Sequence, residues 1–138
     1  MKRWMLWVAA AIAVGGTATR AHHSISSVYD SSRQVTIEGI VAEFKLVNPH
    51  PFLFIDVKGS TGEAQRWQLE MDNRRELVSI GVTTSTFKPG DLVVATGSLA
   101  RRSGQKLYLL RLDRRADGFW YEQVGTSPRI RTPAAQSR

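Results

Sequence analysis

The stretch VTIEGIVAEFKL, residues Val35–Leu46, carries the pattern that decides the fold. Apolar residues alternate with other residues along it, and this period of two is typical of a half-buried strand. They occupy one parity before Gly39 and the other parity after it, and a glycine inside a strand indicates a bulge or a sharp bend. The stretch therefore predicts one long strand that bends at Gly39. The alternating apolar residues are Val35, Ile37, Ile40, Ala42 and Phe44.

Turn signals divide the rest of the chain into further short elements. The sequence NPHP, Asn48–Pro51, ends the first strand because proline has no N–H to donate to a ladder. Asn73 is a good helix N-cap, Glu76 follows it at the spacing of a capping box, and Gly81 can end the helix. The expected elements are strands at 35–46, 52–57 and 65–71, a helix within 73–81, and strands at 92–99 and 107–112.

This order of elements predicts an all-β fold with one short helix. A bent first strand, and a helix between the third and fourth strands, favour a small five-stranded OB-fold-like barrel. Another small β-sandwich or barrel is the alternative. We expect the core to contain Ile37, Val41, Phe54, Trp67, Leu69, Leu77, Val94 and Leu109.

The N-terminus has the pattern of a secretory signal peptide. Two basic residues, Lys2 and Arg3, precede the apolar run Trp4–Val14, and the small residues of Gly15–Ala21 suit cleavage. The run has 11 residues, fewer than the roughly 20 that a transmembrane helix needs. We therefore expect export to the periplasm or the medium and no transmembrane segment in the mature chain.

Composition narrows the possible functions. Loss of the signal lowers the formal charge from +7 to +4, and residues 34–124 carry 12 basic against 11 acidic side chains. This balance lacks the basic stripe of a nucleic-acid binder. The chain has no cysteine, which excludes thiol catalysis, thiolate metal sites and haem attachment through cysteine. The expected parts are a signal peptide (1–21), an N-terminal arm (22–33), the barrel domain (34–124) and a flexible basic tail (125–138).

The three histidines are the candidate metal ligands. Cleavage after Ala21 makes His22 the N-terminal residue, whereas cleavage after Ala18 is the alternative. An N-terminal histidine offers its amine and its imidazole, and His23 or His50 can add a third nitrogen. Three such donors suit Cu(II), the strongest binder among the divalent first-row metals. Tyr29 and Asp30 are expected as axial or outer groups of this site.

A second interpretation makes the histidines incidental. The pair His22-His23 is then the solvated start of an arm, and His50 only stiffens a turn. The protein would be a non-enzymatic periplasmic binding or interaction module that uses the barrel loops. We expect no enzyme, because no serine has an obvious triad partner; a metal-dependent oxidative activity is the minor alternative. The expected partners are a metal ion or a periplasmic protein, without nucleic acid, and the expected state is a monomer.

Short motifs in a fixed order also resemble a known family. They are AHHS at Ala21–Ser24, YD at Tyr29-Asp30, EG at Glu38-Gly39, NPH at Asn48–His50, Trp67, and KPGD at Lys88–Asp91. The chain resembles, from Ala21 to about Gly118, a family of exported bacterial proteins known only as a domain of unknown function. That family implies export and no particular activity.

A looser resemblance concerns the stretch KPGDLVVATGSL, residues 88–99. It is similar to the fourth strand of periplasmic OB-fold proteins, including the haem chaperones of cytochrome maturation. Those chaperones carry a membrane anchor and a haem-attaching histidine near the C-terminus. This chain has no histidine after His50, which counts against a haem role.

Overall fold

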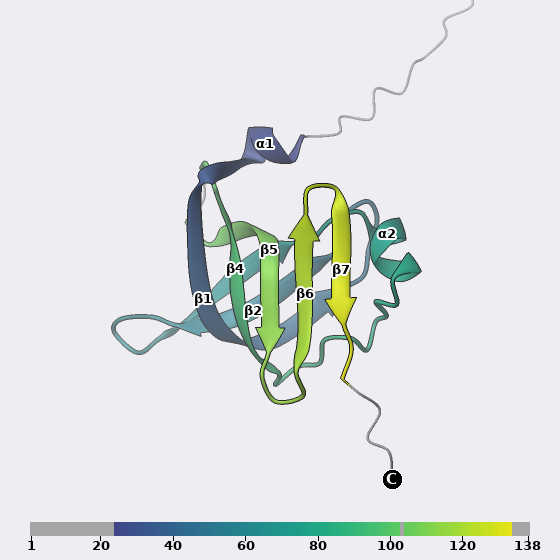
Figure 1. Ribbon diagram of the computed structural model, residues 1–138. Helices are drawn as coiled ribbons and strands as arrows, with labels where there is room; N and C mark the ends of the chain where they lie inside the picture. Colours follow the sequence, from purple (N-terminus) through teal and green to yellow (C-terminus); the bar gives the residue numbers. More distant parts are fainter. Residues whose placement is uncertain (1–23, 103, 134–138) are drawn as a thin grey trace, which may run out of the picture.

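Strands dominate the protein, with one short helix before them and one among them (Figure 1). The computed structural model describes residues 24–102 and 104–133. The elements in chain order are α1 (Ile25–Val28), β1 (Tyr29–Lys45), β2 (Phe52–Lys58), β3 (Ala64–Glu70), α2 (Arg74–Ser79), β4 (Leu92–Ala100), β5 (Lys106–Arg114), β6 (Phe119–Val124) and β7 (Ser127–Arg131). The prediction of a mostly β fold with a short helix between the third and fourth strands is confirmed.

The 17-residue strand β1 connects two parts of the sheet. Most of its length pairs antiparallel with β4, and its last residues pair antiparallel with β2. The ladder with β4 shifts register between Asp30 and Gln34, and the ladder with β2 shifts between Val41 and Glu43. A bulge bends its strand and increases the local twist. Strand β1 can therefore leave one partner and follow the other.

The strand order is β3-β2-β1-β4-β5-β6-β7, and β3 also pairs with β5. This last pairing is parallel and aligns Gln68 with Lys106 and Glu70 with Tyr108. The hydrogen-bonded pairs of β1, β2, β3, β5 and β4 thus form a closed circuit. Strands β6 and β7 continue the sheet beyond β5, so the structure has seven described strands where the sequence predicted five.

Two expected boundaries are wrong. The predicted flexible tail, residues 125–138, contains β7, whose Pro128 lies opposite Gln123 in the ladder with β6. Proline is tolerated there because β7 pairs on one side only, and Ile130 packs against the core. The predicted arm, residues 22–33, overlaps α1 and the start of β1, where Tyr29 already pairs with Ala100.

The core lies inside the closed circuit and includes Phe119 and Tyr121 of β6. Of the expected core residues, four are fully buried, while Ile37 and Trp67 are partly buried against the core. The four are Val41, Leu69, Leu77 and Leu109. The prediction is wrong for Phe54 and Val94, because their neighbours in sequence occupy the inward side of the strand. Leu53, Ile55, Val93 and Ala95 are those inward residues.

Glycines allow two close approaches of neighbouring strands. A Cβ at Gly39 would lie 2.7 Å from the carbonyl oxygen of Asp56, so this position holds a glycine for space. The change of parity expected there occurs instead at the bulge after Val41, and Ile40 is 42% exposed. At Gly97, a Cβ would collide with the carbonyl oxygen of Tyr108 on β5.

The KPGD turn is held to the β5–β6 turn by one arginine. The guanidinium of Arg114 donates to a carboxylate oxygen of Asp91 at 2.8 Å and to the carbonyl of Thr86 at 2.6 Å. It also pairs with Asp117 and lies 4.8 Å from the ring centroid of Phe119. The hydrogen bond from Arg114 lowers the pKa of Asp117 below its usual range. Asp91 therefore has a structural role.

Replacing Gly97 by alanine should destabilise the protein by about 1–3 kcal/mol or more, because β4 or β5 must shift to admit the methyl group. Urea unfolding would measure the change. Gly104→Ala is the matched control, since a Cβ at Gly104 meets no atom within 4 Å, and it should change stability by less than about 0.5 kcal/mol. Equal stabilities of the two variants would contradict the close approach.

Deleting residues 127–138 should lower the melting temperature by roughly 5–10 °C, because it uncovers β6 and removes Ile130 from the core edge. Deleting only residues 134–138 removes no described pairing and serves as the control. An unchanged melting temperature for the longer deletion would mean that β7 contributes nothing to stability.

Candidate functional site

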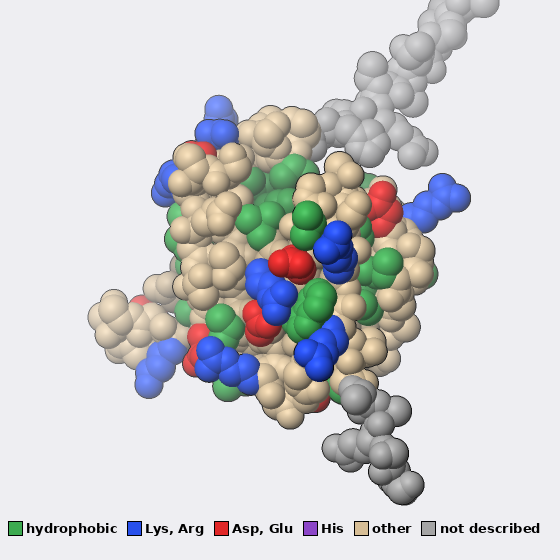
Figure 2. All heavy atoms as spheres, in the orientation of Figure 1, with side chains coloured by type: hydrophobic (Ala, Val, Ile, Leu, Met, Phe, Trp, Pro, Cys, Tyr) green, Lys and Arg blue, Asp and Glu red, His purple; other side chains and the backbone are tan. Residues whose placement is uncertain are grey.

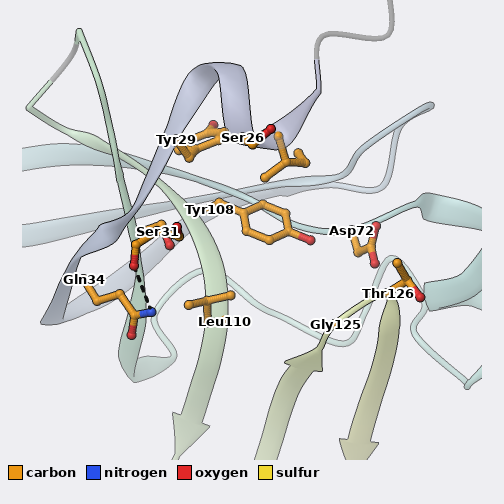
Figure 3. A pocket seen from close by; sticks show the side chains of 11 residues that line it. Ser26, Tyr29, Ser31, Gln34, Asp72, Tyr108, Leu110, Gly125 and Thr126 are labelled. Atoms are coloured by element: carbon orange, nitrogen blue, oxygen red, sulfur yellow. Dashed lines mark hydrogen bonds between the residues drawn. The ribbon is translucent and has the colours of Figure 1, made fainter.

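A hollow of about 530 Å³ opens between α1, the start of β1, β5 and the β6–β7 turn (Figure 3). We call it the α1 hollow. Its main lining residues are Tyr29, Gln34, Asp72, Ser98, Tyr108 and Leu110. Hydrophobic side chains are visible in it below α1 in Figure 2, whereas charged side chains gather over β5, β6 and β7.

A small apolar cluster forms the floor and one wall of this hollow. It consists of Tyr29, Ala100 and Tyr108, with Ile25 and Leu110 packed against it, and it is separate from the main core. The cluster arises because Tyr108 lies between the inward residues of β5 and so faces away from the circuit. The ring centroids of Tyr29 and Tyr108 are 5.9 Å apart, with the planes tilted by 41°.

A chain of polar side chains holds Asp72, which lines the hollow. The hydroxyl of Tyr121 donates to the side-chain carbonyl of Gln123 at 2.8 Å, and the Gln123 amide donates to Asp72. Asp72 also accepts from the backbone N–H of Asn73 at 2.7 Å. The carboxylate of Asp72 is thus held in place where β3 leads into α2. Sequence reasoning missed it, although its position just before the predicted N-cap was a usable indication.

His50 lies beside this region, and its hydrogen bond indicates which tautomer the neutral ring adopts. Its Nδ1 atom is 3.0 Å from the carbonyl oxygen of Met71 and 3.7 Å from a carboxylate oxygen of Glu70. Since a carbonyl oxygen can only accept, Nδ1 carries the hydrogen. In the neutral ring, Nε2 then carries the lone pair.

The loop around His50 is fixed by its own backbone bonds to the β3–α2 region. The carbonyl of Pro51 accepts from the N–H of Met71, and the carbonyl of Pro49 accepts from the N–H of Arg74, both at 2.9 Å. The side chain of Arg74 donates to the carbonyl of Leu46, also at 2.9 Å. These bonds hold the imidazole next to the end of β3.

Glu70 connects His50 to the start of β1. The hydroxyl of Tyr29 donates to Glu70 at 2.6 Å, so one carboxylate contacts Tyr29 with one oxygen and approaches His50 with the other. Burial raises the pKa of Tyr29, and the hydrogen bond and charge of Glu70 raise it further. Tyr29, Glu70 and His50 therefore form one polar group, of which the sequence indicated Tyr29 and His50 but not Glu70.

Asp30 serves a different purpose. Its carboxylate accepts from the hydroxyl of Ser32 at 2.7 Å and from the N–H of Ser32 at 3.1 Å, which closes the bulge in β1. These bonds lower the pKa of Asp30, with a smaller contribution from Arg101 at 3.5 Å. The carboxylate of Asp30 thus bonds to Ser32 and Arg101, and it forms no hydrogen bond or ion pair with Glu70 or His50.

The other two candidate ligands, His22 and His23, lie outside the described residues. Within residues 24–102 and 104–133, no three side chains of His, Asp or Glu converge on a point that could hold a metal ion. The metal site expected from the sequence thus remains a prediction, for which the structure supplies the surroundings of His50.

Comparison with known proteins gave one match. The sequence model of a family of unknown function, DUF6152, matches residues 10–109, which is more than half of the chain and ends in β5. No curated protein and no solved structure matches the chain. No helix among the described residues is long and apolar enough to cross a membrane.

Burial of all three tyrosines predicts an alkaline limit to stability. The chain has three tyrosines, and burial is the main cause that raises the pKa of each: Tyr29, Tyr108 and Tyr121. In the unfolded chain they ionise near pH 10. Stability should therefore be unaffected by them below pH 10 and should fall above it by at most about 1.4 kcal/mol per pH unit for each tyrosine.

Ultraviolet absorbance of tyrosinate, recorded together with circular dichroism, measures this effect. Ionisation should coincide with unfolding, whereas the chain in denaturant should titrate near pH 10 as the control. A tyrosine that ionises near pH 10 while the protein stays folded would contradict the burial of that side chain.

Proposed function

The chain belongs to DUF6152, a family of unknown function, and from that premise we propose that it is an exported, non-enzymatic protein that binds a divalent metal, Cu(II) in particular. The proposed ligands are the amine and imidazole of His22, with His50 or His23 as the third nitrogen donor. Export to the periplasm or the medium, with cleavage after Ala21, is part of the proposal because it creates the N-terminal amine.

The state of His50 is the observation that carries the proposal. Ligating histidines commonly donate their second ring N–H to a carbonyl or a carboxylate, which fixes the ring and its tautomer. His50 already meets this condition through the carbonyl of Met71. Nε2 is then the nitrogen with an available lone pair, and imidazole nitrogen suits Cu(II). The nearby carboxylate of Glu70 favours a cation at this place.

Chain length permits His22 to reach this region. Three residue steps separate His22 from α1, and α1 itself has four residues. At full extension the Cα atom of His22 is at most about 17 Å from that of Tyr29. Tyr29 in turn contacts Glu70, the neighbour of His50. The length of the chain therefore permits a site formed by His22 and His50.

We further propose that the closed circuit of β1, β2, β3, β5 and β4 is an OB-fold-like barrel. The parallel β3–β5 pairing and the helix between β3 and β4 support this assignment. Strands β6 and β7 are then an added hairpin. The His50 loop joins the first two strands of such a barrel, and loops at a barrel mouth are frequent binding places.

The processed protein should bind one Cu(II) ion, with an affinity that falls as pH drops through the histidine range near 6.5, because protons compete for the same nitrogens. His22→Ala should weaken binding most, since only the amine remains. His50→Ala should weaken it by at least about tenfold if His50 is a ligand. His23→Ala is the matched variant that tests the alternative third donor. Calorimetry and electron paramagnetic resonance would measure affinity and nitrogen ligation.

A form with extra residues before His22 provides the decisive control. It keeps every side chain but removes the N-terminal amine from the site, so its affinity should fall sharply. Mass spectrometry of the exported protein should show His22 as the first residue. Equal copper affinity of the extended and processed forms would defeat the proposal and leave the histidines incidental to another binding role.

A further inference from the structure

We propose that the α1 hollow binds a small organic cation, a protonated amine carried on an apolar or aromatic body. This inference does not use the copper ligands, because no histidine among the described residues lines the hollow. Its volume of about 530 Å³ falls within the roughly 300–1,000 Å³ typical of small-molecule sites. Such sites are mostly apolar, with a few converging polar groups, and the α1 hollow has both.

Two largely buried residues with hydroxyl groups line the hollow. Ser98 is 4% and Tyr108 is 8% exposed, and both line the hollow. Neither hydroxyl makes a hydrogen bond to another residue of the described chain. They are not sealed inside the protein either, since the single sealed side-chain atom without a partner among the described residues is Nε1 of Trp67. Both hydroxyls are therefore open to the hollow and available to hydrogen-bond a ligand there.

Asp72 supplies the charge. It is the one charged residue that lines the hollow among those described, and Figure 3 shows the Tyr108 hydroxyl pointing toward it. Each of its oxygens accepts one bond, from Asn73 or from Gln123, and a carboxylate oxygen can accept two. A carboxylate with unused acceptor capacity favours an ammonium group over a neutral or anionic one.

The electrostatic field agrees with this choice. The pKa of Tyr108 is raised first by burial and then by the charges of Asp72, Glu70 and Glu76. Three carboxylates therefore act on this hydroxyl, although the whole chain carries a formal charge of +7. In Figure 2, the hollow below α1 shows hydrophobic side chains, and basic side chains lie over β5, β6 and β7.

The walls determine the rest of the ligand. Ile25, Leu110 and the rings of Tyr29 and Tyr108 offer apolar surface beside the carboxylate. Aromatic faces also attract cations. A ligand that fits both features has an ammonium group at Asp72 and an apolar or aromatic part against the tyrosines. A sugar would leave this apolar surface without a partner, and a carboxylate ligand would be repelled by Asp72.

Three probes of similar shape test the charge: phenethylamine, phenethyl alcohol and hydrocinnamate. Calorimetry or nuclear magnetic resonance titration of the full protein should give the amine an affinity about tenfold higher than the alcohol and no measurable binding of the carboxylate. Asp72→Asn should abolish the preference for the amine. Glu63→Gln makes the same charge change in the exposed β2–β3 loop and should leave the preference intact.

Two further variants keep the test valid if Asp72→Asn disturbs the Gln123 contact. Tyr108→Phe and Ser98→Ala remove only hydroxyls without partners, so each should keep the melting temperature and weaken amine binding about 2–10-fold. Ser60→Ala, in the β2–β3 loop, is the control. Equal affinities for the three probes, binding of none of them, or a preference that survives Asp72→Asn in a folded protein would overturn the proposal.

The copper proposal and this one fail separately. His50→Ala should leave phenethylamine binding unchanged, and Tyr108→Phe should leave copper affinity unchanged. Loss of amine binding in His50→Ala would show that the hollow is not an independent site.

Discussion

One strand, β1, has to hydrogen-bond to β4 along most of its length and to β2 at its end, and the rest of the structure depends on this constraint. A regular strand cannot serve two partners that diverge. Bulges provide the bends, and Gly39 removes the Cβ that would meet the carbonyl of Asp56. Once β1 bends, β2 and β3 are carried around until β3 reaches β5, and their parallel pairing closes the circuit.

The same constraint assembles the candidate sites. Tyr29 is the first residue of β1, Glu70 is the last residue of β3, and Tyr108 on β5 is the register partner of Glu70. Closure of the circuit therefore brings a tyrosine, a carboxylate and a second tyrosine together. His50 joins them because its loop is bonded to the residues that follow β3. The proposed metal site and the α1 hollow are adjacent for this reason.

Polar groups elsewhere show what is unusual about the hollow. The guanidinium of Arg114 is used by Asp91, Asp117 and a backbone carbonyl, and the hydroxyl of Tyr121 is used by Gln123. Such pairing removes the cost of burying polar atoms. The hydroxyls of Ser98 and Tyr108 make no hydrogen bond within the described chain, but they are open to the hollow and are not sealed from solvent. A structural role accounts for Arg114 and Tyr121, whereas the hydroxyls of Ser98 and Tyr108 are available to the proposed ligand.

The sequence by itself determined the local features. Alternation of apolar residues predicted most of β1, and turn signals delimited β2 through β5. Asn73 was correctly identified as the N-cap of α2, where its side chain accepts from the N–H of Arg75. These features depend on neighbours a few residues apart. Tertiary structure decided that Phe54 and Val94 do not face the core and that Pro128 pairs in β7. It also decided that Tyr108 lines the hollow. Each depends on strand register and on contacts between distant segments, which alternation along one segment does not specify.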